Sequence, residues 1–137
     1  MIKFVESSSM KVDVLKHQQK QISSLDKIEQ VLEAKKALGF DIAMDSQTVG
    51  FAMVREYQNS KYFLWVYAID KKFQGQGLGK KCLKEFLVFL KQKYGCTELS
   101  TTYKMGNTVA KNLYESLGFQ EIEKVEEEKE VDMILKL

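Results

Sequence analysis

The chain has 137 residues, of which 45% are hydrophobic and 29% charged, and 21 Lys and Arg against 19 Asp and Glu give a net charge of +2. A chain of this length forms one domain around one core. No apolar run approaches the roughly 20 residues that cross a bilayer, and so small a net charge does not indicate nucleic-acid binding. We therefore expect a single domain over residues 1–137, with neither a membrane span nor a nucleic-acid partner.

The amino terminus, MIKFVESSSMK, lacks the apolar segment and the small-residue cleavage site of a secretory signal. This favours a cytoplasmic protein, in which the two cysteines, Cys82 and Cys96, are reduced thiols. Neither cysteine has a Cys or His at metal-ligand spacing, so we expect no metal site and no redox pair. Both cysteines are expected to be buried.

The first forty residues are predicted to form a short strand, residues 2–6, and two helices. The first helix rests on apolar positions at roughly helical spacing, which are Val12, Leu15 and Ile22. The second has a serine cap, an apolar stripe and a terminal glycine, which are Ser23 or Ser24, then Leu25, Ile28, Leu32 and Leu38, then Gly39.

Strands are predicted over residues 40–44 and 49–56, and the polar turn at residues 45–47 joins them into a hairpin. Residues 62–69 are aromatic and β-branched almost throughout, which is typical of a central strand covered on both faces.

The second half of the chain alternates helices and strands. A helix over residues 79–94 ends at Gly95, and a strand follows at 98–102. Thr108 can cap a helix with the apolar face Val109, Leu113 and Leu117, and Gly118 ends it. Two strands, 119–125 and 131–137, flank an acidic turn. Helices that interrupt a mixed sheet predict an α/β or α+β domain.

A glycine-rich loop, Gln74-Gly75-Gln76-Gly77-Leu78-Gly79-Lys80, lies between the central strand and the long helix. Consecutive backbone N–H groups and a helix N-terminus form an anion site there, for which phosphate is the natural ligand. Basic residues gather around the loop, although a solvated helix face would also explain them: Lys71, Lys72, Lys80, Lys81 and Lys84.

The spacing excludes two common phosphate loops. A Walker loop needs Gly at position 74 and Ser or Thr at position 81, where this chain has Gln74 and Lys81. A dinucleotide fingerprint needs two residues between its second and third glycines, and only Leu78 separates Gly77 from Gly79.

The loop instead resembles the pattern Gln/Arg-x-x-Gly-x-Gly/Ala of the GNAT (GCN5-related) N-acetyltransferases, present here as Gln74, Gly77 and Gly79. The resemblance continues through LWVYAIDKKFQGQGLGKKCL, ELSTTY and GNTVAKNLYESLGF, and covers about the C-terminal two-thirds of the chain. It is closest to the bacterial spermine/spermidine (diamine) acetyltransferases. Two departures concern the acceptor side: Val66 stands where many relatives carry a charge, and the loop at 56–61 is short.

The resemblance implies the GNAT fold, a single mixed, mostly antiparallel twisted sheet flanked by about four helices, with a splay between the two central parallel strands. It implies acetyl-CoA as cosubstrate and a homodimer, for which residues 131–137 offer an edge strand. It also implies the residues that bind acetyl-CoA. The pantetheine arm would contact the backbone of Ala68 and Ile69, the pyrophosphate would contact the main-chain N–H groups of Gln74, Gly75, Gln76, Gly77, Leu78, Gly79 and Lys80, and Asn107 and Lys111 would lie beside the pantetheine. A side chain at Gly77 should not be tolerated.

Tyr114, in LYESLGF, matches the family position of a general acid that assists the departing CoA thiolate. Periodicity alone would make Tyr114 a core aromatic beside Leu113. No Ser or Cys stands with a His as a nucleophile constellation, so direct attack by the amine is favoured over an acyl-enzyme.

The general base stays open between Glu56, Asp70 and a water chain, and His17, the only histidine, is expected on the surface. The expected acceptor is a primary amine, with polyamines such as spermine and spermidine first. Peptide N-termini, lysines and aminoglycosides are alternatives, and so is a non-catalytic acyl-CoA-binding module.

Overall fold

The computed structural model describes residues 1–137, apart from the side chains of Lys20 and Gln21. Its strands are β1 (Ile2–Ser7), β2 (Leu38–Met44), β3 (Gln47–Gln58), β4 (Lys61–Ile69), β5 (Glu98–Lys104), β6 (Gln120–Val125) and β7 (Glu130–Lys136). Its helices are α1 (Leu25–Glu33), α2 (Leu78–Tyr94) and α3 (Thr108–Ser116), with short 3-10 helices η1 (Lys16–Gln21) and η2 (Lys71–Phe73).

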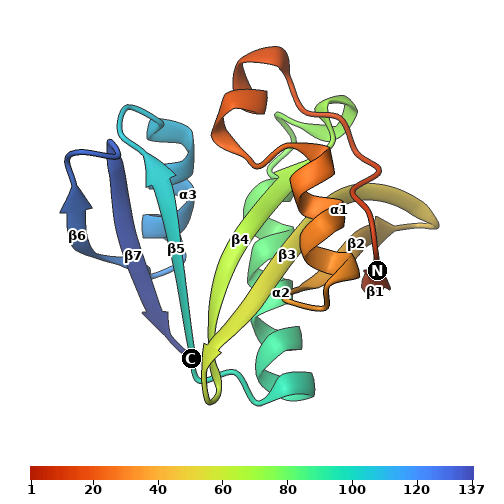
Figure 1. Cartoon of the computed structure of the whole chain (residues 1–137). Coiled ribbons are helices and arrows are strands. Elements are labelled where there is room, and N and C mark those ends of the chain that lie inside the picture. The colour runs from red at the N-terminus through yellow and green to blue at the C-terminus, as the bar shows by residue number, and fades with distance from the viewer.

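All seven strands form one sheet in the order β1-β2-β3-β4-β5-β7-β6. Every neighbouring pair is antiparallel except β4 and β5, which are parallel. These two strands pair only where Lys61–Leu64 lie beside Glu98–Thr101. Beyond that point they diverge, as Figure 1 shows for the green and cyan strands. The predicted mixed sheet with a splay between two parallel strands is therefore confirmed.

A bulge at Trp65 shapes the diverging end of β4. Leu64 pairs with Val54 and Val66 with Met53, so that Trp65 is an extra residue in the ladder. Two residues that would share a face in a regular strand consequently point to opposite faces. Leu64 packs in the core under α2, whereas Val66 packs under α1.

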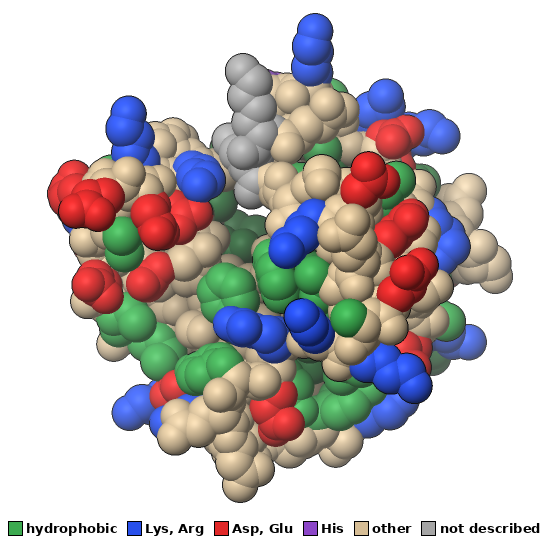
Figure 2. Space-filling model, viewed as in Figure 1, with side chains coloured by type: hydrophobic (Ala, Val, Ile, Leu, Met, Phe, Trp, Pro, Cys, Tyr) green, Lys and Arg blue, Asp and Glu red, His purple; other side chains and the backbone are tan. Residues whose placement is uncertain are grey.

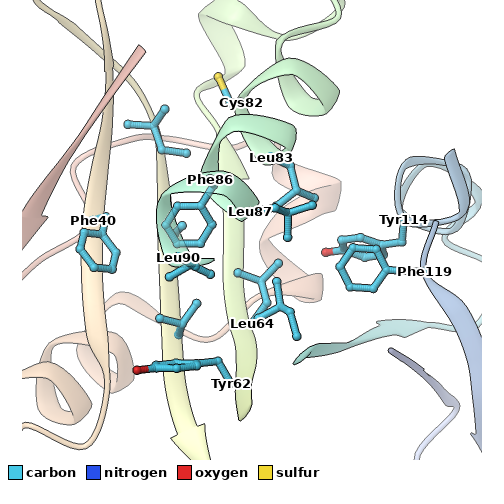
Figure 3. Close-up of a cluster of buried hydrophobic side chains, with 14 of the residues drawn as sticks. Phe40, Tyr62, Leu64, Cys82, Leu83, Phe86, Leu87, Leu90, Tyr114 and Phe119 are labelled. Atoms are coloured by element: carbon cyan, nitrogen blue, oxygen red, sulfur yellow. The ribbon is translucent and has the colours of Figure 1, made fainter. Parts of the chain in front are cut away.

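The sheet is covered on both faces. α2 and α3 lie behind it in Figure 1 and α1 lies in front. Figure 3 shows the larger core, where one face of α2 meets the sheet and Tyr114 lies against Phe119 with ring centroids 5.3 Å apart. The helical spacing of the buried α2 residues accounts for this face, which is formed by Leu78, Cys82, Leu83, Phe86, Leu87 and Leu90. The two cysteines are free and buried, as predicted.

Several element boundaries follow the prediction closely. The hairpin turn places Asp45 and Ser46 at φ 50° and 69°, the left-handed pair of a type I′ turn. α2 ends at Gly95 with φ 66°. Both candidate serines before α1 are used: the Ser24 Oγ accepts from the Lys27 N–H, and the Ser23 Oγ accepts from the Trp65 indole at 3.2 Å.

Three predictions were wrong. In place of the first predicted helix there is only the short 3-10 helix η1, preceded by extended chain. In that extended chain Val12 is buried and Leu15 is exposed, so the two residues do not share the face of one helix. α1 ends at Glu33, and Gly39 lies in β2. A Cβ at position 39 would come within 2.7 Å of the Ser7 carbonyl oxygen, so glycine allows β1 to approach closely. Lastly, β7 lies between β5 and β6 and is no edge strand. In place of about four helices, the described residues form three α-helices and two 3-10 turns.

No helix among the residues that the structure describes is long and apolar enough to span a membrane.

Candidate active site

A cavity of about 550 Å³ lies where β4 and β5 diverge. Figure 2 shows the surface hollowed between the C-terminal lobe, formed by β5, β6, β7 and α3 on the left, and the rest of the molecule. Four parts of the chain form its walls: the N-terminal segment, the end of β4, the glycine loop with the start of α2, and the start of α3. The cavity residues are Val14, His17, Gln18, Ile22, Tyr67, Ala68, Ile69, Gln74, Gly75, Gly77, Leu78, Gly79, Lys80, Gly106, Asn107, Thr108, Val109, Ala110, Leu113 and Tyr114.

The predicted acetyl-CoA and catalytic residues therefore lie mostly in one place. Two of them do not line the cavity. Gln76 is not among the lining residues, and Lys111 lines another hollow with Tyr103, Glu121 and Lys124. Lys111 is thus not brought together with Tyr114.

The glycine loop presents unpaired N–H groups to the cavity. Gly75 and Gly77 have φ of 78° and 77°, which only glycine adopts without strain. Gly77 is the N-cap of α2 and has no capping side chain, so the first-turn N–H groups of Leu78, Gly79 and Lys80 have no protein partner among the described hydrogen bonds. A Cβ at Gly77 would meet no protein atom within 4 Å. The need for glycine there is thus the backbone conformation and the space left for a ligand. This arrangement suits the pyrophosphate of a nucleotide.

The side chain of Gln74 holds the loop through three hydrogen bonds. Its Nε2 donates to the Ile69 carbonyl at 2.8 Å and to the Gln18 Oε1 at 2.8 Å, while its Oε1 accepts from the Gln18 Nε2 at 3.0 Å. Gln18 Oε1 also accepts from the Leu15 N–H. The reciprocal amide pair satisfies the polar atoms of both side chains and fixes their orientation.

A second set of contacts ties the N-terminal segment to the end of β4. The Lys71 N–H donates to the Asp13 carbonyl at 2.7 Å, and the Asp70 Oδ2 accepts from the Asp13 N–H at 3.1 Å. We call residues 13–18 the N-terminal strap. Sequence reasoning predicted a helix there and missed these contacts, because residues 13–15 are extended and only residues 16–18 belong to the short 3-10 helix η1.

The Asp70 carboxylate is occupied by these contacts. Burial works to raise its pKa, but the hydrogen bonds from the Lys72 and Asp13 amides, with the charges of Lys72 and Lys71, outweigh burial and lower the pKa. Glu56, the other acid considered as a base, accepts from the Ser60 N–H and lines a different hollow with Tyr62. Neither acid lines the cavity.

The backbone at the end of β4 faces the splay at alternate residues. Asp70 N–H donates to Val49, and a Cβ on Gly50 would lie 2.7 Å from the Ala68 carbonyl oxygen, so Ala68 points its carbonyl toward β3. Because neighbouring residues alternate, the backbone groups of Tyr67 and Ile69 face the splay. The Ala68 backbone, which was expected to contact the pantetheine arm, therefore points toward β3.

Tyr114 lies at the inner end of the cavity. Its side chain is 7% exposed, and Figure 3 shows the hydroxyl end directed toward Leu87 and Leu64. Burial raises the pKa of the phenol, and a hydrogen bond with Thr101 opposes this rise. Thr101 also donates to the Leu64 carbonyl at 3.0 Å, in the last residue pair before the strands diverge. Tyr114 is thus both a core aromatic and a cavity residue.

The start of α3 differs from the prediction in its cap. The Asn107 Oδ1 accepts from the Ala110 N–H at 3.1 Å, so Asn107 caps the helix and Thr108 is its first residue. Asn107 lines the cavity wall, and its Nδ2 donates none of the described hydrogen bonds. Val109, predicted to be on the buried face, is 76% exposed at the cavity rim. Among the described residues, no group of three or more His, Cys, Asp or Glu could hold a metal ion.

Comparison with known proteins identifies the family to which this site belongs. Residues 10–119 match the model of the acetyltransferase (GNAT) family. The spermine/spermidine N(1)-acetyltransferase of Bacillus subtilis (strain 168) is 30% identical over 113 residues, 74% of each chain. The ribosomal protein bS18-alanine N-acetyltransferase of Escherichia coli (strain K12) is 32% identical over 89 residues, 65% of this chain and 59% of that one.

A crystal structure of a GNAT family acetyltransferase from Elizabethkingia anophelis with acetyl-CoA bound shares the fold at a TM-score of 0.76, with 15% identity over 99% of this chain and 98% of that chain. The unpaired N–H groups at the start of α2 fit the pyrophosphate of acetyl-CoA. The chain belongs to the acetyltransferase (GNAT) family and is an acetyl-CoA-dependent N-acetyltransferase.

Proposed function

We propose that the protein transfers the acetyl group of acetyl-CoA to a primary amine of a polyamine such as spermine or spermidine, by direct attack of the amine. One observation carries this proposal: a single cavity joins the N–H groups at the start of α2 to the phenol of Tyr114. An acyl-CoA carries both a pyrophosphate and a thioester, so a phosphate site and a buried acid in one cavity suit it as a donor.

The residues have separate roles in this proposal. The N–H groups of Leu78, Gly79 and Lys80 bind the pyrophosphate, and the Tyr67 and Ile69 backbone receives the pantetheine arm as a strand would be received. The Asn107 Nδ2 binds a pantetheine carbonyl. Tyr114 donates its proton to the CoA sulfur as the C–S bond breaks and then takes the proton that the new amide nitrogen loses. No covalent acyl-enzyme is needed.

The polyamine assignment is supported by similarity to the Bacillus enzyme and by one feature of the C-terminal lobe. Asp132 of β7 and Glu123 of β6 lie directly opposite each other. Like charges in such a pair repel. The pKa of Asp132 is raised mainly by burial and to a lesser extent by the charges of Glu123 and Glu130. Glu130 is paired with Lys104 at 2.7 Å, whereas Asp132 and Glu123 lie outside the cavity and attract a distal ammonium group of the polyamine.

The test is a thiol-release assay with acetyl-CoA and a panel of spermine, spermidine, an aminoglycoside, a peptide N-terminus and a lysine peptide. We expect kcat/KM to be highest for a polyamine. A clear preference for a peptide would mean that the acceptor is a peptide and not a polyamine, in line with the similarity to the ribosomal-protein acetyltransferase. Acetyl-CoA binding without thiol release from any amine would instead favour an acyl-CoA-binding module.

A homodimer and a cytoplasmic setting are parts of the same proposal. The two buried thiols agree with a reducing compartment. For dimerisation the available edge strands are β1 and β6, and β6 carries Ile122, which is 58% exposed. Sedimentation that shows only a 15.8 kDa species at micromolar concentration would reject the homodimer.

A further inference from the structure

Direct attack requires a group that takes a proton from the acceptor. A primary aliphatic amine has a pKa of roughly 10.4 and arrives as an ammonium ion at neutral pH. Among the described residues that line the cavity there is no Asp or Glu, and the titratable ones are His17, Lys80, Tyr67 and Tyr114. The acids named above are outside it: Asp70 is bound to backbone amides, Glu56 lies in another hollow, and Asp132 and Glu123 do not line the cavity.

The remaining cavity groups are poorly suited to accept this proton. Lys80 lies in the first turn of α2, where the phosphate of the donor belongs. The Tyr67 hydroxyl donates to the Gly79 carbonyl at 2.6 Å, and burial raises its pKa. Tyr114 is the proton donor to the CoA sulfur in the proposed mechanism. His17 is the one side chain in the set whose type ordinarily exchanges protons near neutral pH.

We propose that His17 is the general base that accepts the proton of the acceptor ammonium, and that the Gln18–Gln74 amide pair positions it at the cavity wall. This inference rests on the proposed function. The amine nitrogen gives one proton to the imidazole, attacks the thioester carbonyl, and loses its second proton to the Tyr114 phenolate after Tyr114 has protonated the sulfur. His17 is exposed, so the proton that it holds leaves to bulk water.

The position of His17 is fixed by the strap that carries it. Gln18, its neighbour, is held at 2.8 and 3.0 Å by Gln74, and Asp13 is held by the Lys71 N–H at 2.7 Å. The same Gln74 holds the Ile69 carbonyl, at the end of the strand that receives the donor. Donor site and base are therefore joined by one side chain. The charged and titratable groups on the surrounding elements are Lys16, Asp13, Tyr67, Asp70, Lys71, Lys72, Lys80 and Tyr114.

The experiment compares His17→Ala with Gln19→Ala, an exposed neighbour on η1 that does not line the cavity. We expect His17→Ala to lower kcat/KM for the best amine by roughly 100-fold at pH 7, with unchanged acetyl-CoA affinity by calorimetry. The defect should shrink by about tenfold per pH unit above pH 7, because only free amine reacts in the variant. Added imidazole should restore part of the rate. Gln19→Ala should behave as wild type.

A structural role for His17 would give a pH-independent loss without rescue by imidazole, and that outcome would overturn the inference. An unchanged rate in His17→Ala would overturn it as well. If Tyr114→Phe is impaired while His17→Ala is normal, the proposed function stands and the base assignment fails. If the wild type releases no thiol with any amine, both fail.

The positioning role of Gln18 has its own test. Gln18→Ala should lower kcat/KM for the amine, and the double variant Gln18→Glu with Gln74→Arg should recover activity, because an ion pair replaces the amide pair. No recovery, together with an acetyl-CoA affinity equal to that of the wild type, would remove the pair from the mechanism.

Discussion

The hydroxyl of Tyr67 in β4 donates a 2.6 Å hydrogen bond to the carbonyl of Gly79 in the first turn of α2. The bond links the strand that borders the splay to the helix N-terminus that faces the donor. Tyr67→Phe keeps the ring and removes the bond. A net hydrogen bond contributes about 1 kcal/mol, so we expect acetyl-CoA to bind about fivefold more weakly. Calorimetry measures this, and an affinity equal to that of the wild type would contradict the link.

Glycine 77 provides the test of the phosphate site, since its φ of 77° strains any other residue while no protein atom fills the space beside it. Gly77→Ala should lose about 1–2 kcal/mol of unfolding free energy. Gly77→Asp should in addition abolish acetyl-CoA binding, because it places a negative charge beside the pyrophosphate, whereas Gly77→Asn of similar size should retain part of it.

The matched control is Gly95→Ala at the other end of α2. Gly95 has φ 66° and equally open surroundings. It should show the same loss of stability by denaturant unfolding and no loss of acetyl-CoA affinity. If Gly95→Ala also weakens binding, the effect at Gly77 reflects helix stability and the phosphate assignment fails.

Tyr114→Phe separates the two roles of a residue that is both core and cavity wall. The ring still packs against Phe119, so the unfolding free energy should change little. Loss of the proton donor should lower kcat by roughly 100-fold or more with acetyl-CoA affinity retained. Single-turnover kinetics on the best amine checks this, and an unchanged chemical step would leave Tyr114 only a packing role.

The raised pKa of Asp132 predicts an unusual pH dependence of the free energy of unfolding. Its folded-state pKa is raised, first by burial and then by Glu123 and Glu130. The folded state therefore binds the proton more tightly, and the corresponding stability is present at acid pH and lost as pH rises through the folded pKa. Asp132→Asn should be more stable than wild type at pH 7 by on the order of 0.5 kcal/mol, with no difference below the ordinary carboxyl range. Denaturant melts at several pH values test this.

The Asp132→Asn variant also tests where the cationic acceptor binds. Spermine should raise the melting temperature of the wild type more than that of Asp132→Asn, because a cation relieves the repulsion with Glu123. Equal shifts in the two proteins would place the acceptor cation elsewhere.

The sequence by itself determined the family motif, the order of most elements and the donor. Gln74, Gly77 and Gly79 stand close together in the chain, and local backbone rules are enough to predict a phosphate loop at a helix start. The hairpin, the stop of α2 at Gly95 and the buried cysteines were readable for the same reason. Each depends on residues within one element or one turn.

The tertiary structure alone decided which backbone groups face the splay and what surrounds the loop. Trp65 adds one residue to β4, and that bulge exchanges the faces of every residue after it, which no periodicity in the sequence reveals. Gln18 and Gln74 are 56 residues apart, and their pairing depends on a strap in which extended chain leads into the short 3-10 helix η1. His17 was expected on the surface, and it is exposed. Contacts between distant segments are set by packing, so His17 became a candidate only when the fold placed it beside the cavity.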